Sequence, residues 1–233
     1  MEILAMIPTY NEAENIERMI KEILDLPLNI EVLVVDDFSP DGTYKLVENI
    51  MKNEKRVHLL LRKENRGRGF ASIDGYKKAL ELGAKLILEM DGDGSHAPKY
   101  IPSIYEKMKT SNADIVSGSR FIEGGKDEDR PITRKIISAF AKKYLYLILG
   151  IKLKDPSSGF RLIKKEVLEK ITPLLKAKDP FIITEVYFYA QKYAFKLAES
   201  PIEFFQRLAG TSKLDPLILI KYLFRVLKLR FSN

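Results

Sequence analysis

LILEMDGDGSH, residues 86–96, is the stretch that decides the fold. Its first five residues are a largely apolar run that predicts a buried strand, and two aspartates separated by one glycine follow directly. Glycine lets the backbone bend and lets a ligand approach closely. Carboxylates at i and i+2 can both reach one hard cation such as Mg²⁺ or Mn²⁺, because these cations prefer oxygen ligands. The alternative is an ordinary polar turn that closes the strand.

Strand and helix patterns alternate outward from this stretch through the first half of the chain. The expected strands are residues 3–7, 32–35, 57–61, 86–90 and 113–117. The expected helices are residues 11–26, 41–51, 69–82 and 98–108. This order predicts an α/β fold, with a mostly parallel sheet flanked by helices and with ligands at the carboxyl ends of the strands.

The second half of the chain has a less regular pattern. The expected helices are residues 132–149, 181–193 and 217–231, and a strand is expected at 196–205. A turn at 155–159 leads into a short strand and another helix, and a basic loop is expected at 207–215.

Composition limits the possible functions. The chain has 233 residues, which suits one large α/β domain, and no cysteine, which excludes a disulfide scaffold and a thiol nucleophile. The net charge of +7 favours phosphates, nucleic acid or an anionic membrane. The lysines are spread along the chain without a nucleic-acid motif, so no nucleic-acid partner is expected. Without a basic leader pattern or an apolar run of roughly 20 residues, we expect an intracellular protein that does not span a membrane.

Polar clusters follow the first two predicted strands. Tyr10 offers a ring that could stack on a nucleobase, and Glu12 offers an acceptor for a base edge or a ribose. The alternative for this cluster is a strand exit in which Asn11 caps the next helix. Asp37 stands where it could bind a base or a ribose hydroxyl, whereas Asp41 is interpreted as a helix cap.

Two basic clusters could meet phosphate. Residues 62–69 contain Gly-x-Gly, but Ser72 stands where the dinucleotide fingerprint has its third glycine. That stretch could help to hold phosphate, although a solvated turn is favoured. Arg120 is positioned by the end of the fifth strand, and Arg134 begins the next helix. Guanidinium groups bind phosphate in bidentate fashion.

These clusters together resemble one family, the dolichyl-phosphate mannose synthases, which are inverting glycosyltransferases of the GT-A fold. The resemblance spans residues 3–213. It rests on PTYNE (8–12), VDDFSPDGT (35–43), residues 65–75, MDGDGSH (90–96), GSRF (118–121), SSGFR (157–161) and RLAGTSK (207–213).

The resemblance implies GDP-mannose as the donor and dolichyl phosphate, or another polyprenyl phosphate, as the acceptor. It implies Mg²⁺ or Mn²⁺ on Asp91 and Asp93, and catalytic roles for Asp93, Arg120 and Arg134. The implied acceptor-phosphate contacts are Arg134 and Ser138. The implied donor contacts are Pro8, Tyr10, Glu12, Val35, Asp37, Asp91, Gly92, Asp93, Arg120, Arg207 and Lys213. Ser95 stands where some relatives carry glutamine, so no third metal ligand is expected there.

The chemistry leaves two points open. A phosphate acceptor is already largely dianionic at neutral pH, since its second pKa is about 6, and it therefore needs no general base. Asp155 and Glu185 nevertheless remain candidate bases. A related GT-A enzyme that uses UDP-glucose, another nucleotide sugar or a glycan acceptor also remains possible.

The C-terminal segment suggests contact with a membrane. We expect a catalytic domain at residues 1–215 and a basic-apolar helix within 216–233. Ile220, Leu223, Phe224, Leu227 and Phe231 share one stripe of that helix, with Lys221, Arg225 and Lys228 beside it. Such a helix lies in a membrane interface or packs on the core. With the apolar segment 144–149, it predicts peripheral attachment to the cytoplasmic face of a membrane, with a membrane-anchoring partner subunit as a further option.

Overall fold

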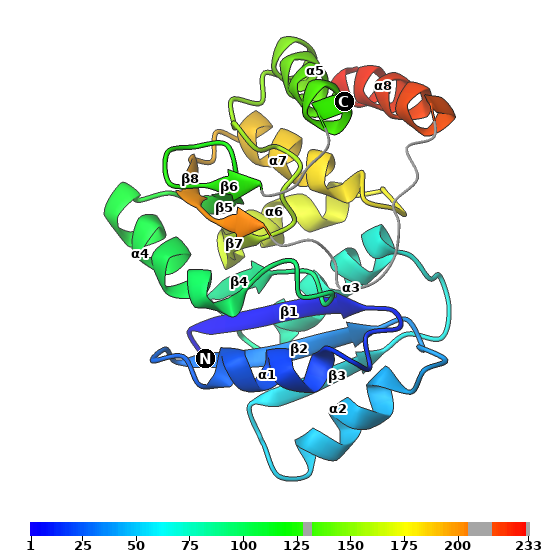
Figure 1. Ribbon diagram of the computed structural model, residues 1–233, viewed down its shortest axis with the longest axis vertical. Coiled ribbons are helices and arrows are strands. Elements are labelled where there is room, and N and C mark those ends of the chain that lie inside the picture. Colours follow the sequence, from blue (N-terminus) through cyan, green and yellow to red (C-terminus); the bar gives the residue numbers. More distant parts are fainter. Residues whose placement is uncertain (128–131, 205–215, 232–233) are drawn as a thin grey trace.

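One seven-stranded sheet runs through the protein in the order β3-β2-β1-β4-β7-β5-β8 (Figure 1). The computed structural model describes residues 1–127, 132–204 and 216–231, with the backbone alone at 132–136 and 216–218. The strands of this sheet are β1 (Ile3–Thr9), β2 (Ile30–Asp36), β3 (Val57–Leu61), β4 (Leu86–Glu89), β5 (Ile115–Ser119), β7 (Arg161–Lys164) and β8 (Leu197–Pro201). A small second sheet pairs β6 (Lys126–Asp127) with β9 (Glu203–Phe204).

The large sheet is parallel except at β7. The pairs β1–β2, β2–β3, β1–β4 and β5–β8 are parallel, whereas β7 lies antiparallel between β4 and β5. The predicted α/β fold with a mostly parallel sheet is therefore confirmed. The carboxyl ends of β1, β2, β4 and β5 meet at one edge, which is where parallel sheets bind ligands.

Both faces of the sheet are buried, as β1 illustrates. Ile3, Ala5 and Ile7 belong to one apolar cluster, and Leu4 and Met6 belong to the other. Successive side chains of a strand point to opposite faces, so a strand covered on both sides must be apolar throughout. One face is covered by α1 (Ile16–Leu24), α2 (Thr43–Met51) and α4 (Ile101–Ser111). The other is covered by α3 (Arg68–Glu81), α6 (Lys165–Ile171) and α7 (Ile182–Lys192). The helices α5 (Ile132–Leu149) and α8 (Pro216–Arg230) belong to the same apolar cluster and lie beyond α7 (Figure 1).

Most expected elements are present, with shifted ends. The expected strand 196–205 is divided into β8 and β9 at Ile202. The backbone N–H of Ile202 donates to Ser119 O at the end of β5, and its carbonyl accepts the N–H of Lys126 in β6. The helix expected from residue 11 begins at Ile16, so Asn11 does not cap it. Asp41 does support the start of α2, since its Oδ1 accepts the backbone N–H of Thr43 at 3.0 Å.

A buried charge network joins β4, β7 and α3. Glu89 at the end of β4 stands directly opposite Arg161 at the start of β7, and both side chains are fully buried and ion-paired. Arg68 Nη1 also donates to Glu89 Oε1 at 2.6 Å, and Ser72 and Tyr76 of α3 donate their hydroxyls to the same carboxylate. Burial would raise the pKa of Glu89, but Arg161 and Arg68 hold it well below its usual value. Glu89 therefore stays ionised inside the protein.

We expect Glu89→Ala to lower the free energy of unfolding by about 3–5 kcal/mol, because it leaves two buried arginines without their shared partner. Urea unfolding at neutral pH measures this, with Glu54→Ala as the control that removes an exposed ion pair to Arg56. Because the pKa of folded Glu89 lies below its unfolded value, its stabilisation should be lost as pH falls below about 4.5 toward the folded pKa. A loss under 1 kcal/mol would contradict the role given to this carboxylate.

Candidate active site

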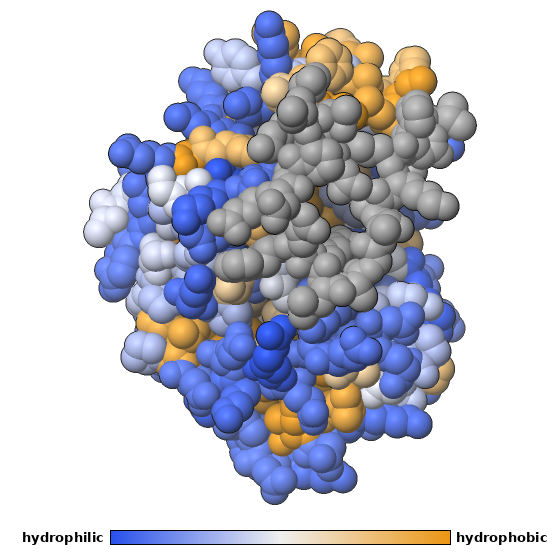
Figure 2. All heavy atoms as spheres, viewed as in Figure 1, coloured by the Kyte–Doolittle hydropathy of each residue, from blue (hydrophilic) through white to orange (hydrophobic). Residues whose placement is uncertain are grey.

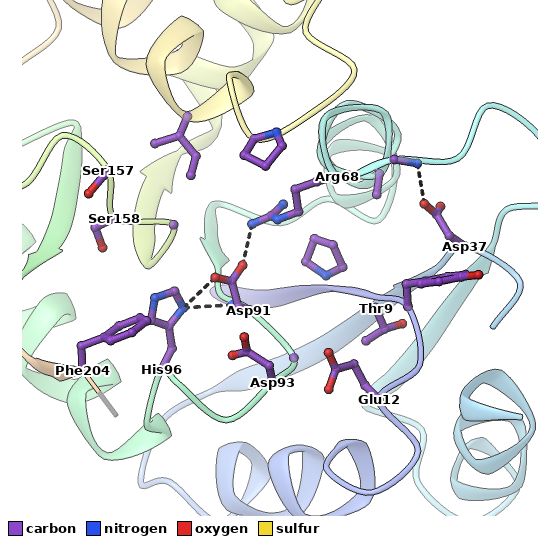
Figure 3. Close-up of a pocket in the computed structure, with 18 of the residues that line it drawn as sticks. Thr9, Glu12, Asp37, Arg68, Asp91, Asp93, His96, Ser157, Ser158 and Phe204 are labelled. Atoms are coloured by element: carbon purple, nitrogen blue, oxygen red, sulfur yellow. Dashed lines mark hydrogen bonds and ion pairs between the residues drawn. The ribbon is translucent and has the colours of Figure 1, made fainter. Parts of the chain in front are cut away.

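A cavity of about 810 Å³ opens at the carboxyl edge of the sheet (Figure 3). The strand ends that reach it are those of β1, β2, β4 and β5. The expected site residues that line it are Pro8, Tyr10, Glu12, Asp37, Asp91, Gly92, Asp93 and Arg120. The fold thus brings the ends of four strands to one cavity, although Pro8 and Arg120 are 112 residues apart in the sequence.

Other expected residues lie elsewhere. The side chain of Val35 is fully buried in the core and does not line the cavity. A donor contact by Val35 remains a prediction. Ser138 lines a second cavity. The side chain of Arg134, and the whole of Arg207 and Lys213, fall outside the residues that the structure describes.

Asp91 and Asp93 lie in the turn after β4 and point into the cavity (Figure 3). Gly94 takes φ +76, which closes the turn in a conformation that favours glycine. Ser95 donates both its backbone N–H and its hydroxyl to Asp93 Oδ1, at 3.0 and 2.5 Å. Ser95 therefore orients a carboxylate rather than facing the cavity as a ligand.

The two aspartates fit a divalent cation as a pair. In the described part of the chain, no group of three or more His, Cys, Asp or Glu side chains is placed to hold a metal. Two carboxylates beside a large cavity are the donor set of a Mg²⁺ site that keeps positions open for phosphate oxygens. Burial would raise the pKa of Asp91, but Arg68 keeps it below its usual value, so the carboxylate is ionised.

His96 supports the same turn from beneath. Its Nδ1 accepts the backbone N–H of Asp91 at 3.0 Å, which assigns the ring proton to Nε2. The ring stacks on Phe160 and meets Phe204 edge-on. Burial lowers the pKa of His96, so the ring is neutral. No role was expected for His96 from the sequence, although this residue ends the motif at residues 86–96.

Asp37 is held by the loop that follows β3. Its carboxylate is paired with Arg62, and its Oδ2 accepts the backbone N–H of Gly67 at 2.7 Å. The favoured interpretation of residues 62–69 as a solvated turn is wrong for Arg62, which is 6 % exposed, and for Arg68, which bonds Glu89 and Asp91. Propensity and spacing could not reveal this, because the partners are distant in sequence.

Arg120 leaves the end of β5 and is tied to Asp155. Its Nε and Nη2 donate to the two oxygens of that carboxylate at 2.7 and 2.8 Å, and Nη2 also donates to Ser157 Oγ at 2.9 Å. The guanidinium lies near the rings of Phe121 and Phe204, 5.1 and 4.9 Å from their centroids. This bidentate pairing fixes the orientation of Arg120 at the cavity wall.

Neither candidate base is well suited to that role. Burial would raise the pKa of Asp155, but Arg120 lowers it below its usual value. Glu185 accepts the backbone N–H groups of Lys176 and Ala177 at 2.8 and 2.9 Å and lines neither cavity. Burial raises the pKa of Glu185, but its carboxyl group lies away from both cavities.

A second cavity of about 680 Å³ adjoins the first, because Ser157, Pro180 and Ile183 line both. It lies among α5, α7 and α8 and the loop before β7. Its wall combines apolar side chains such as Leu145 and Phe181 with basic ones such as Lys221. This cavity was not expected from the sequence, in which its signal was the two apolar segments 144–149 and 217–231.

Comparison with known proteins places the chain in a family. Residues 5–172 match the model of glycosyl transferase family 2. The chain is 36% identical over 216 residues to an undecaprenyl-phosphate mannosyltransferase of Micrococcus luteus, covering 92% of this chain and 88% of that protein. It is 33% identical over 225 residues to a polyprenol monophosphomannose synthase of Mycolicibacterium smegmatis, covering 96% of this chain and 84% of that protein.

Solved structures support the fold. A glucosyl-3-phosphoglycerate synthase from Mycobacterium tuberculosis, solved with Mg²⁺ and uridine diphosphate, superposes with a TM-score of 0.68 at 17% identity, covering 98% of this chain and 79% of that one. At that identity the likeness concerns the fold alone. The family match covers most of the chain and includes both aspartates of the turn after β4. The protein therefore belongs to glycosyl transferase family 2 and is a glycosyltransferase.

Proposed function

We propose that the protein transfers a mannosyl group from GDP-mannose to a polyprenyl phosphate such as dolichyl phosphate. The observation that carries this proposal is the joining of two unlike cavities, one lined by charged side chains that include Asp91 and Asp93, the other largely apolar and lined by α5, α7 and α8. A phosphate at the end of an isoprenoid chain needs both environments. The names of the two mannosyltransferase relatives support the same donor sugar and acceptor class.

The first cavity would hold the donor. Tyr10 is half exposed beside it and offers a ring for the base, while Glu12 and Asp37 offer carboxylate oxygens. Pro8 and Gly92 line the same cavity and would contact the donor there. Contacts from Val35, Arg207 and Lys213 remain part of this proposal.

Asp91 and Asp93 would hold Mg²⁺ or Mn²⁺ through their carboxylate oxygens. The bound cation would supply positive charge beside the diphosphate, which gains negative charge as it leaves. Arg120 is held at the same wall by Asp155 and would lie against phosphate there. The side chains of this chain thus bind and orient the diphosphate.

The acceptor phosphate would enter from the second cavity, past Ser138 and the start of α5, where Arg134 lies in sequence. A phosphate oxygen would attack the anomeric carbon while the bond to the diphosphate oxygen breaks, and GDP would depart with the electron pair. This single displacement inverts the anomeric configuration. It needs no general base, because the acceptor is already an anion.

The apolar end of the molecule formed by α5 and α8 would meet the membrane. Figure 2 shows hydrophobic side chains gathered there. Phe140, Tyr146 and Leu147 of α5 are exposed, as are Ile220, Phe224, Leu227 and Phe231 on or beside α8. On the opposite side of α8, Val226 and Leu229 are buried in the core, so this helix packs on the core and also presents an apolar face.

Within the described residues, no helix is long and apolar enough to span a membrane. We propose peripheral attachment at the cytoplasmic face, with a membrane-anchoring subunit as an optional partner.

We expect the purified protein, supplied with Mg²⁺ and a prenyl phosphate, to move radiolabelled mannose from GDP-mannose into an organic phase, and not glucose from UDP-glucose. Asp91→Asn or Asp93→Asn should reduce turnover by at least about a hundredfold, the scale of a lost electrostatic group. Asp25→Asn, on the exposed end of α1, is the matched control. Preferential use of UDP-glucose would refute the donor, and near-normal activity of both variants would refute the cation site.

Arg120→Ala should lower kcat more than it weakens GDP-mannose binding, because the charge on the leaving diphosphate is greatest in the transition state. Single-turnover rates and donor dissociation constants separate the two effects. Arg56→Ala, at an exposed ion pair remote from the cavity, is the control, and Arg120→Lys tests charge without bidentate pairing. A higher donor dissociation constant with unchanged kcat would contradict this role.

Replacing Phe224 and Phe231 together by Glu should weaken binding to anionic liposomes by at least about tenfold, because each ring buries apolar area in the interface. Liposome sedimentation measures this, and Tyr193→Glu, an exposed aromatic beyond α7, is the control. High salt should weaken wild-type attachment without abolishing it, since the apolar part is not screened. Unchanged sedimentation of the folded double variant would assign the membrane contact to another surface.

A further inference from the structure

Arg68 links the buried charge network to the mouth of the site. It is the first residue of α3, and its side chain is 19% exposed. Its Nη1 donates to Glu89 Oε1 at 2.6 Å, and its Nη2 donates to Asp91 Oδ1 at 3.0 Å. Figure 3 shows the side chain extending toward Asp91 within the cavity. One guanidinium therefore bridges a core carboxylate and a carboxylate of the site.

The buried carboxylate already has a cation of its own. Arg161 faces Glu89 across the β4–β7 pair and is ion-paired with it. Arg68 is thus a second arginine on Glu89, and the charges of Glu89, Asp91, Arg68 and Arg161 sum to zero. Without Arg68, the Asp91–Asp93 pair would carry a net charge of −2, and with Arg68 beside it the net charge is −1. Arg68 therefore halves the negative charge offered to a cation.

The contact with Asp91 is sheltered from water on one side. A Cβ atom added to Gly159 would lie 3.5 Å from both carboxylate oxygens of Asp91 and 3.6 Å from Arg68 Nη2. The backbone of the loop before β7 thus covers the ion pair. Screening by solvent weakens there, so a unit charge has a larger effect than on an open surface.

The geometry also distinguishes the two oxygens of Asp91. Oδ1 accepts from Arg68. Oδ2 lies 3.8 Å from His96 Nδ1, and that nitrogen already accepts the backbone N–H of Asp91, so it has no proton to offer Oδ2. Arg68 thus engages Oδ1, whereas neither Arg68 nor His96 donates a hydrogen bond to Oδ2.

We propose that Arg68 is a positioning residue that couples cation binding to donor binding. It reduces the negative charge of the aspartate pair, so the pair alone binds a divalent cation weakly. The phosphates of a nucleoside diphosphate supply the missing negative charge, and cation and donor then bind together. This inference rests on the proposed cation site at Asp91 and Asp93.

A purely structural role for Arg68 predicts the opposite sign. If Arg68 served only to satisfy Glu89 and brace the turn, its removal would loosen Asp91 and weaken cation binding. If it sets the charge of the site, its removal strengthens cation binding in the absence of nucleotide. The direction of the change in affinity therefore decides between the two roles.

The test is Mn²⁺ binding to the full-length protein, measured by electron paramagnetic resonance with and without GDP. We expect Arg68→Met to tighten Mn²⁺ binding without GDP by roughly tenfold, the scale of one unit charge a few ångströms from a divalent ion. The enhancement of Mn²⁺ affinity by GDP should shrink by a similar factor. Arg68→Lys should stay near wild type, and Arg56→Met is the matched control at a remote ion pair.

If Arg68→Met does not fold, Mn²⁺ binding is compared between Glu89→Gln and Glu89→Gln/Arg68→Met. In both of these variants residue 89 is neutral, so removing Arg68 leaves no buried carboxylate without a partner at that position. Unchanged or weaker Mn²⁺ binding on removal of Arg68 would overturn the inference while leaving the proposed cation site intact. Wild-type protein that binds no Mn²⁺ even with GDP would instead overturn the cation site, and the coupling with it.

Discussion

The ion pair between Glu89 and Arg161 is the interaction on which the rest of the structure depends. Both side chains are fully buried, and they stand opposite one another where β4 meets the one antiparallel strand, β7. Buried charges cost several kcal/mol each unless they are paired and hydrogen-bonded. A slip of one residue in this register would turn each side chain to the opposite face of the sheet. The pair therefore fixes how β4 and β7 align.

That alignment positions both walls of the cavity. Asp91 follows Glu89 by two residues, and Gly159 precedes Arg161 by two, so the aspartate turn and the opposing loop extend from the same pair. The close approach of Gly159 to Asp91 is the result. Arg68 then joins α3 to this frame through Glu89. The buried charge network thus determines how close Asp91, Gly159 and Arg68 lie to one another at the mouth of the site.

The two cavities divide the problem of joining a sugar to a lipid phosphate. The first is built from strand ends and carries the carboxylates and Arg120, while the second is lined by α5, α7, α8 and the loop before β7. Ser157, Pro180 and Ile183 form their common wall. The charged groups lie at the ends of strands. The apolar surface lies on α5 and α8, and part of it is exposed to solvent. Under the proposed function, the reaction would take place where the two cavities join.

The sequence by itself determined the elements and the edge of the sheet that carries the site. Continuous apolar runs and helical spacing are local signals, and Asp37, Asp91 and Arg120 were placed together because each follows an expected strand. Tertiary structure alone decided the antiparallel insertion of β7, the second cavity, and the partners of Glu89, Arg62 and Arg68. Glu89 lies in an apolar strand, and its partner Arg161 lies 72 residues away. Periodicity describes a residue's own segment, whereas a buried charge takes its partner from whichever segment the fold brings within hydrogen-bonding distance.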